Sequence, residues 1–107
     1  MPITITKDNH QEKIIDSFKP IVLDVYATWC GPCQLMNPII DELETEYATT
    51  ITFAKLNVDD SRELAIHYGI TSIPTFIFIK NGQVITKETG SRTKKELESK
   101  ITEYLIK

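Results

Sequence analysis

The sequence predicts an α/β fold, in which a mostly parallel sheet has helices on its faces and an antiparallel hairpin at one edge. The first observation is that short apolar runs rich in β-branched residues alternate, over 107 residues, with segments of helical periodicity. The second is Asn81-Gly82, which stands between two such runs and is a strong signal for a two-residue hairpin. The predicted order is βαβαβαββα, with right-handed crossovers between the parallel strands. Periodicity alone leaves the order of the strands in the sheet open.

Five runs are predicted strands, and a chain of this length suits one domain over residues 1–107. The run IVLDVYA, residues 21–27, is almost continuously apolar, which is typical of a central parallel strand buried on both faces. The other predicted strands are 3–5, 51–58, 75–80 and 83–89.

Two predicted helices lie in the first half of the chain. The first covers about residues 7–18, with Thr6 as its cap and a proline after its end. The second begins within residues 30–32 and continues to about residue 48. Pro38 falls inside this second helix and is expected to kink it.

Two further helices are predicted from their end signals. A short one is expected to have Asp60 as its cap, Glu63 three residues later, and Gly69 just past its end. The last helix is expected to open with Thr93 and Glu96 as a capping box.

Charge and hydropathy exclude several classes of protein. The formal net charge is −3, and the absence of a basic run with interleaved aromatic residues argues against nucleic-acid binding. The amino-terminal residues lack the basic flank and apolar core of a signal peptide, and the apolar runs are too short to span a bilayer. We therefore expect a cytoplasmic protein that does not bind membranes. In a reducing compartment, its two cysteines are expected to be catalytic or metal-binding.

Both cysteines lie in the pentapeptide WCGPC. Proline is favoured in the first turn of a helix, so Pro32 predicts that a helix begins here. Cys30 would then lie at the amino end of the helix, where the helix dipole and unpaired N–H groups lower the pKa of a thiol. Cys33 would follow one turn later, within disulfide reach. This spacing predicts redox catalysis, in which one sulfur attacks and the other resolves.

Three other interpretations of the cysteine pair are weaker. A zinc site needs two further ligands, and His10 and His67 are far apart in the sequence and form no ligand pair. A structural disulfide that closes so short a loop would stabilise the fold little. Cysteines that serve only for packing would not need a glycine and a proline between them.

Two charged residues interrupt predicted strands. Asp24 lies inside the apolar run just upstream of the sulfurs, where burial should raise the pKa of its carboxyl. Lys55 lies inside the run at 51–58. The two could form a structural buried pair, which is weak evidence for stability. The position of Asp24 near the end of its strand favours a functional role instead.

The tetrapeptide Ser72-Ile73-Pro74-Thr75 stands at the start of a predicted strand. Its proline could simply begin the strand, or it could be a cis proline that holds a tight turn. Base rates alone favour the trans form.

Together these residues resemble the thioredoxin family over nearly the whole chain. WCGPC is the active-site motif of that family, and Gly31-Pro32 is the dipeptide typical of its reductases. The joint match is much more specific than a lone Cys-X-X-Cys. The agreement extends to Asp24, Pro38, Lys55, Ile73-Pro74-Thr75 and Gly90.

The resemblance implies the thioredoxin fold, a five-stranded mixed sheet of order 1-3-2-4-5 flanked by four helices. It also implies that Pro74 is cis and faces the sulfurs. The residues implied to border the substrate groove are Trp29, Val58, Ile73, Pro74 and Gly90.

The activity implied is that of a thiol–disulfide oxidoreductase that reduces disulfides in client proteins. Cys30 would attack the client disulfide, and Cys33 would resolve the mixed disulfide. Asp24, whose pKa Lys55 would shift, would accept the proton of Cys33. A thioredoxin reductase would then reduce the oxidised pair. The resemblance implies a monomer with no metal and no bound cofactor, because the cysteine pair is itself the redox-active group.

Two alternatives stay open at this point. One is an oxidase or isomerase of the same family, which the Gly-Pro dipeptide and the lack of a signal peptide disfavour. The other is a binding subunit of a larger assembly, in which the thiols are incidental. The intact cysteine pair together with Asp24 disfavours this second alternative.

The sequence departs from the family pattern at four positions. Gln34 stands where many members have a lysine, which removes a positive charge near the sulfurs and should slightly weaken thiolate stabilisation. Tyr26 stands where many have a second tryptophan, and Thr89 and Ser91 make the surroundings of the groove glycine more polar. The resemblance therefore predicts the reaction more closely than it predicts which clients the protein prefers.

Overall fold

A computed structural model describes residues 2–107. Its strands are β1 (Ile3–Thr4), β2 (Ile21–Tyr26), β3 (Thr52–Asn57), β4 (Thr75–Lys80) and β5 (Gln83–Thr89). Its helical segments are η1 (Gln11–Ile15), α1 (Gly31–Tyr47), α2 (Arg62–His67) and α3 (Lys94–Ile101), which runs on directly into η2 (Thr102–Ile106).

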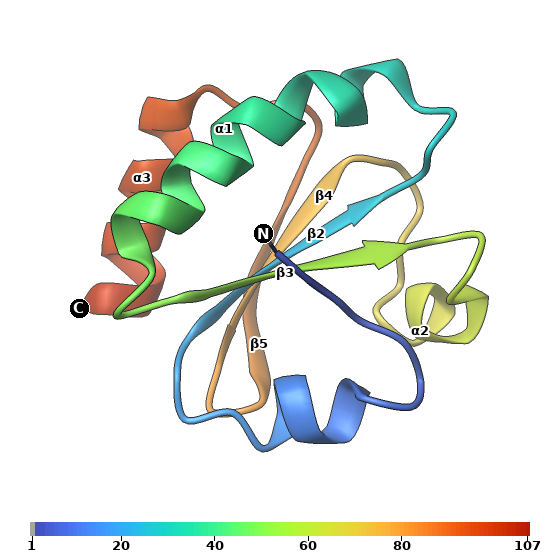
Figure 1. The fold of residues 1–107 in the computed structure, drawn as a ribbon, viewed down its shortest axis with the longest axis horizontal. Coiled ribbons are helices and arrows are strands. Elements are labelled where there is room, and N and C mark those ends of the chain that lie inside the picture. The colour runs from blue at the N-terminus through green and yellow to red at the C-terminus, as the bar shows by residue number, and fades with distance from the viewer. Residues whose placement is uncertain (1) are drawn as a thin grey trace.

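The strands form one sheet of order β1-β3-β2-β4-β5, which confirms the predicted thioredoxin topology (Figure 1). The strands β1, β3 and β2 are parallel, whereas β4 is antiparallel to β2 and β5 is antiparallel to β4. Val25 is paired with Thr75, and Thr75 with Thr89. The carboxyl ends of β2, β3 and β5 therefore lie beside the start of β4. These strand ends form one edge of the sheet.

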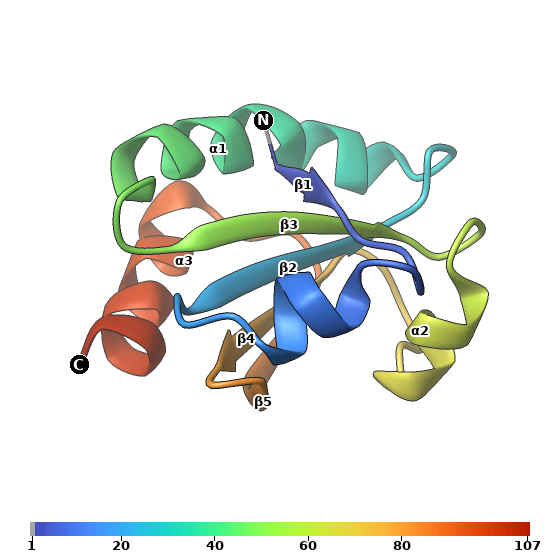
Figure 2. The ribbon, with the colours of Figure 1, turned by 60° about the horizontal axis from the view of Figure 1, so that its bottom comes forward.

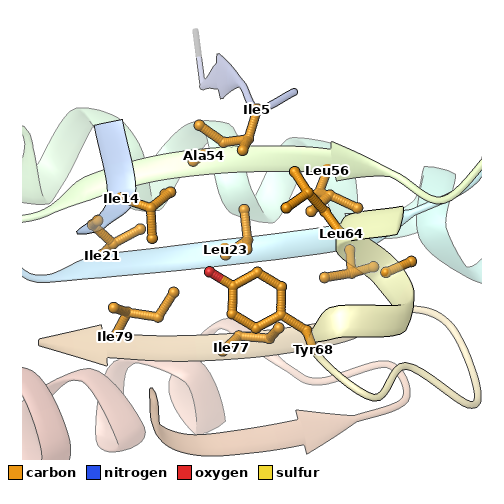
Figure 3. Close-up of a cluster of buried hydrophobic side chains, with 12 residues drawn as sticks. Ile5, Ile14, Ile21, Leu23, Ala54, Leu56, Leu64, Tyr68, Ile77 and Ile79 are labelled. Atoms are coloured by element: carbon orange, nitrogen blue, oxygen red, sulfur yellow. The ribbon is translucent and has the colours of Figure 1, made fainter. Parts of the chain in front are cut away.

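Helices cover both faces of the sheet, α1 and α3 on one and η1 with α2 on the other (Figure 2). Side chains alternate between the faces along each strand. In β2, Leu23 packs on the side of η1 and α2, whereas Val22 packs on the side of α1 and α3. Figure 3 shows Ile14 from η1 and Leu64 from α2 over the sheet. By the same alternation, Asp24 points to the face that α1 covers.

The first helix is shorter and wider than the prediction of residues 7–18. The Asp16 N–H donates to the Gln11 carbonyl, five residues earlier, which makes η1 a π-helical turn. The Thr6 hydroxyl accepts the Asp8 N–H at 3.3 Å, so Thr6 caps the turn that precedes η1. Phe18, at the predicted end, lies outside the helix and is 99% exposed. Ile14 of η1 is fully buried in the core on this face of the sheet, and a local helix pattern does not predict a π-helical turn.

The prediction that Asp60 caps the third helix is wrong. The residue before α2 is Ser61, and it makes no side-chain cap bond, because its hydroxyl donates to the Ile5 carbonyl at 3.3 Å. Asn57 instead organises the loop, since its Oδ1 accepts the N–H groups of Asp59 and Asp60 at 2.9 and 3.3 Å.

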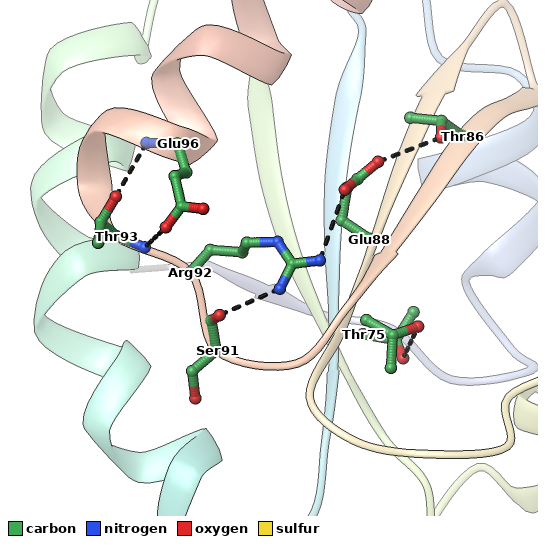
Figure 4. Close-up of polar contacts among 8 residues, drawn as sticks. Thr75, Thr86, Glu88, Ser91, Arg92, Thr93 and Glu96 are labelled. Atoms are coloured by element: carbon green, nitrogen blue, oxygen red, sulfur yellow. Dashed lines mark hydrogen bonds and ion pairs between the residues drawn. The ribbon is translucent and has the colours of Figure 1, made fainter.

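Two other local predictions, the capping box and the two-residue hairpin, are confirmed. Thr93 and Glu96 form a reciprocal capping box at the start of α3 (Figure 4). The helix α1 runs unbroken through Pro38; its predicted kink stays a prediction. Asn81 and Gly82 join β4 to β5 with φ of 54° and 76°, as a two-residue hairpin requires.

Candidate active site

The two sulfurs lie where α1 begins, at the edge of the sheet described above. Cys30 is the N-cap residue of α1, and Cys33 follows one turn later with a Cα–Cα distance of 5.2 Å. The two are joined by a disulfide. The Cys33 N–H donates to Cys30 Sγ at 3.2 Å. In the reduced protein, this N–H and the positive end of the helix dipole would stabilise a thiolate at Cys30.

The disulfide is largely buried and lies among apolar side chains. Cys30 is 6% exposed and Cys33 is 3% exposed, so Cys30 is the more accessible of two largely buried residues. Val58 and Ile73, both predicted to border the groove, pack against the pair. Gly31 has no atom within 4 Å of the place where a Cβ would stand, and it lies with Pro32 on the exposed side of the helix start.

Asp24 lies beneath α1 as a buried carboxyl. It is 1% exposed, and neither of its oxygens has a hydrogen-bond partner within residues 2–107. Lys55, its partner in the register of β2 and β3, places Nζ 4.0 Å from Oδ2. Burial raises the pKa of the Asp24 carboxyl to about 6, against the opposing effect of the Lys55 charge. This carboxyl can therefore take up a proton near neutral pH.

The residues predicted to border the groove come from four loops at the same edge, those that contain Trp29, Val58, Ile73–Pro74 and Gly90. The Ile73–Pro74 bond is cis, as the family resemblance implied. The Gly90 N–H donates to the Pro74 carbonyl at 2.7 Å, so these two segments lie side by side. Gly90 has φ of +93°, which favours glycine at this position. Arg92, after it, contacts Glu88 at 3.6 Å (Figure 4).

Comparison with known proteins agrees with this geometry. The thioredoxin family model matches residues 1–103. The chain belongs to the thioredoxin family. It is 41% identical over 100 residues to a thioredoxin of Chlorobaculum thiosulfatiphilum, an alignment that covers 94% of this chain and 93% of that protein. It is 38% identical over 101 residues to a thioredoxin of Haemophilus influenzae, with 94% of each chain covered. It is 43% identical over 101 residues to the chloroplastic M-type thioredoxin of Pisum sativum, with 94% of this chain and 59% of that protein covered.

Family membership and the paired sulfurs show that this protein is a thiol–disulfide oxidoreductase, as predicted. Within residues 2–107 there is no cluster of three or more side chains suited to bind a metal. No helix in this part of the chain is both long and apolar enough to cross a membrane.

Sequence reasoning missed part of the surface near the cysteine pair. A hollow of about 290 Å³ extends from Trp29, Val58 and Ile73 to Ile66 and to further residues of the α2 region. Ile66 is 68% exposed and Trp29 is 71% exposed. The Trp29 indole N–H donates to Asp59 Oδ2 at 2.8 Å, which orients the ring toward the loop after β3. An exposed isoleucine on a short amphipathic helix was the available signal.

A second residue that the sequence analysis missed is Asn37. Lys55 Nζ donates to Asn37 Oδ1 at 2.7 Å and lies 4.6 Å from the centre of the Tyr26 ring. Asn37 follows Cys33 by one turn on the inner side of α1. A polar residue beside Met36, in an otherwise apolar stripe, was the signal that could have found it.

The two histidines, which the sequence analysis treated as separate, lie together in the fold. The His10 and His67 ring centroids are 6.0 Å apart, and His10 Nε2 lies 2.6 Å from the Tyr68 hydroxyl. Partial burial lowers the pKa of His10, and His67 lowers it further. The two histidines are therefore far apart in the sequence but close together in the fold.

Gln34, the departure from the common lysine, turns back onto the loop before the helix. Its Nε2 donates to the Thr28 carbonyl at 2.6 Å. The side chain thus ties α1 to the loop that contains Trp29, and brings no charge to the sulfurs.

Proposed function

We propose that this protein reduces disulfides in client proteins and is itself recharged by a thioredoxin reductase. The observation that carries the mechanism is the position of Cys30 at the start of α1, with the Cys33 N–H on its sulfur. The direction of the reaction is supported by Gly31-Pro32, which the sequence analysis identified as typical of the family's reductases. We place the protein in the cytoplasm, because a reductase must be recharged in a reducing compartment.

The reaction transfers two electrons from the dithiol to the client. The Cys30 thiolate attacks one sulfur of the client disulfide, whose S–S bond breaks, and the departing client thiolate takes up a proton. A mixed disulfide joins Cys30 to the client. The Cys33 thiol then gives its proton to Asp24 and attacks Cys30 Sγ. The bond between Cys30 and the client breaks, the second client sulfur leaves as a thiolate that takes up a proton, and the Cys30–Cys33 disulfide is formed.

The role of Asp24 as proton acceptor is supported by its position and its chemistry. It shares with Cys33 the space between the sheet and α1, because Asp24 points to the face that α1 covers. Its raised pKa of about 6 allows it to hold a proton near neutral pH. Lys55 is close enough to moderate that pKa but makes no hydrogen bond to the carboxyl.

The expected assay is reduction of a protein disulfide, such as those of insulin, with NADPH and a thioredoxin reductase. The oxidised protein should be reduced by the reductase and should catalyse repeated turnover. The Cys30→Ser variant should show only the uncatalysed rate, because no attacking thiolate remains. Turnover by that variant would contradict the proposal. So would a protein that, in a redox buffer of fixed potential, oxidises a reduced client faster than it reduces an oxidised one.

We further expect the hollow next to α2 to bind an apolar side chain of the client. Replacing Ile66 with serine should lower kcat/KM for a protein client by up to about tenfold, because roughly one apolar contact is lost. Stability should change little, since Ile66 is exposed. Reduction of a small aromatic disulfide, which has no peptide side chain to place against Ile66, should keep its rate.

Phe18→Ser is the matched control for this variant. Phe18 is an exposed apolar residue in the loop before β2, which enters the sheet at the edge opposite the sulfurs. It should leave both reactions unchanged. An equal loss for protein client and small disulfide in Ile66→Ser would show that the hollow does not bind the client.

A further inference from the structure

Lys55, the charged partner of Asp24, is held by a different residue. Its Nζ donates a hydrogen bond of 2.7 Å to Asn37 Oδ1, whereas Asp24 Oδ2 lies 4.0 Å away. The same ammonium lies 4.6 Å from the centre of the Tyr26 ring, whose face attracts a cation. The ammonium thus makes its close polar contact with a neutral amide on α1, and not with the carboxylate beside it.

The distance matters because the site is buried. Asp24 is 1% exposed, and its two oxygens have no hydrogen-bond partner in the described part of the chain. An ammonium hydrogen-bonded to such a carboxylate would stabilise its charged form strongly, since Coulomb attraction grows as the separation falls and is weakly screened. At 4.0 Å, with its hydrogen bond directed elsewhere, Lys55 offsets only part of the cost of burial.

Few other groups can set the charge of Asp24. Lys55 is the charged group that faces it from β3, and Tyr26 contributes a phenol from its own strand. On β4 its register partner is Phe76, which is apolar. On α1 the nearby titratable group is the cysteine pair, which is neutral while it is oxidised.

Asn37 also lies one helical turn from the cysteine that must lose a proton. Cys33 and Asn37 are one turn apart on α1, and both line a hollow of about 360 Å³ with Tyr26 and Gln34. Asn37 therefore accepts the hydrogen bond of Lys55 and also lines the hollow that Cys33 lines.

We propose that Asn37 is a positioning residue, whose amide oxygen holds the Lys55 ammonium off the Asp24 carboxyl and so keeps Asp24 able to accept a proton. The use of that proton-accepting state by Cys33 rests on the function proposed above. The contact between Asn37 and Lys55 is present in the oxidised protein, so the positioning role can be tested without a client.

The decisive measurement is an NMR titration of the Asp24 carboxyl carbon in the oxidised protein. In Asn37→Ala the ammonium loses its amide acceptor and can approach Asp24. The acid dissociation constant of Asp24 should then rise by about tenfold, so that its titration midpoint moves to lower pH. In a Lys55→Met background, adding Asn37→Ala should leave the midpoint unchanged, because Asn37 acts through the ammonium.

Two results would overturn the positioning role. One is an unchanged Asp24 midpoint in Asn37→Ala, and the other is an equal shift with and without Lys55. Thermal melts of all four proteins establish that each is folded. The pH dependence of mixed-disulfide resolution should shift in the same direction as the Asp24 midpoint. If the midpoint moves as expected but the resolution rate does not follow it, the positioning role stands and the proposed proton transfer from Cys33 to Asp24 is wrong.

Discussion

The Cys33→Ser variant should convert this protein into a covalent trap for its clients. The first attack needs only the Cys30 thiolate, which keeps its place at the start of α1 and the backbone N–H that reaches its sulfur. No second thiol remains to attack the mixed disulfide, so the client stays bound and turnover falls to the uncatalysed background. Non-reducing gels should show adducts that disappear when dithiothreitol is added.

The matched control is Cys30→Ser, which should form no adduct. Both substitutions exchange one sulfur for one oxygen, so packing around the pair changes equally little. Cys30 is the more exposed of the two, which favours its attack on a large client. Trapping by Cys30→Ser and not by Cys33→Ser would reverse the two roles.

Asp24→Asn should stabilise the protein, and the gain should depend on pH. The folded state raises the pKa of Asp24 from an ordinary value of 3.8 to about 6, so between these values the folded protein binds more protons than the unfolded chain. The free energy of unfolding of the wild type therefore falls as pH rises through this window. The asparagine variant lacks this loss and should be more stable by about 3 kcal/mol above pH 6, and equally stable near pH 3.

Denaturant melts of the oxidised proteins from pH 3 to pH 8 test this result. Lys55 keeps its hydrogen bond to Asn37 in the variant, and its side chain is 19% exposed to solvent. Equal stability of the two proteins at every pH would mean that the folded state does not raise the pKa of Asp24. The proposed role in proton transfer would then lose its physical basis.

The same variant should slow resolution of the mixed disulfide by about tenfold to a hundredfold, because asparagine cannot take the proton of Cys33. The first attack by Cys30 should change less. Rapid-mixing single-turnover measurements separate the two steps. A variant slowed equally in both steps would indicate a change in the surroundings of the pair instead of the loss of a proton acceptor.

Several features of this protein were determined by a few neighbouring residues, and these could be predicted from the sequence. Asn81-Gly82 specifies its hairpin because the turn requires positive φ at both positions, and Thr93 with Glu96 specifies a helix start by mutual hydrogen bonds. The start of α1 at WCGPC was likewise predicted from neighbouring residues, because proline is favoured in the first turn of a helix. The strand order and the cis bond before Pro74 were predicted through the family resemblance, since periodicity contains neither.

The tertiary structure decided the features that depend on residues distant in the chain. At η1 a short π-helical turn with Ile14 in the core stands in place of the longer predicted helix, and the Ser61 hydroxyl donates to the Ile5 carbonyl instead of capping α2. The hydrogen bond from Lys55 to Asn37 joins residues 18 apart on different elements, and the contact of His10 with Tyr68 joins residues 58 apart. Each depends on which helix lies over which strand. No local pattern encodes such contacts, because they are stabilised only when burial brings the two segments together.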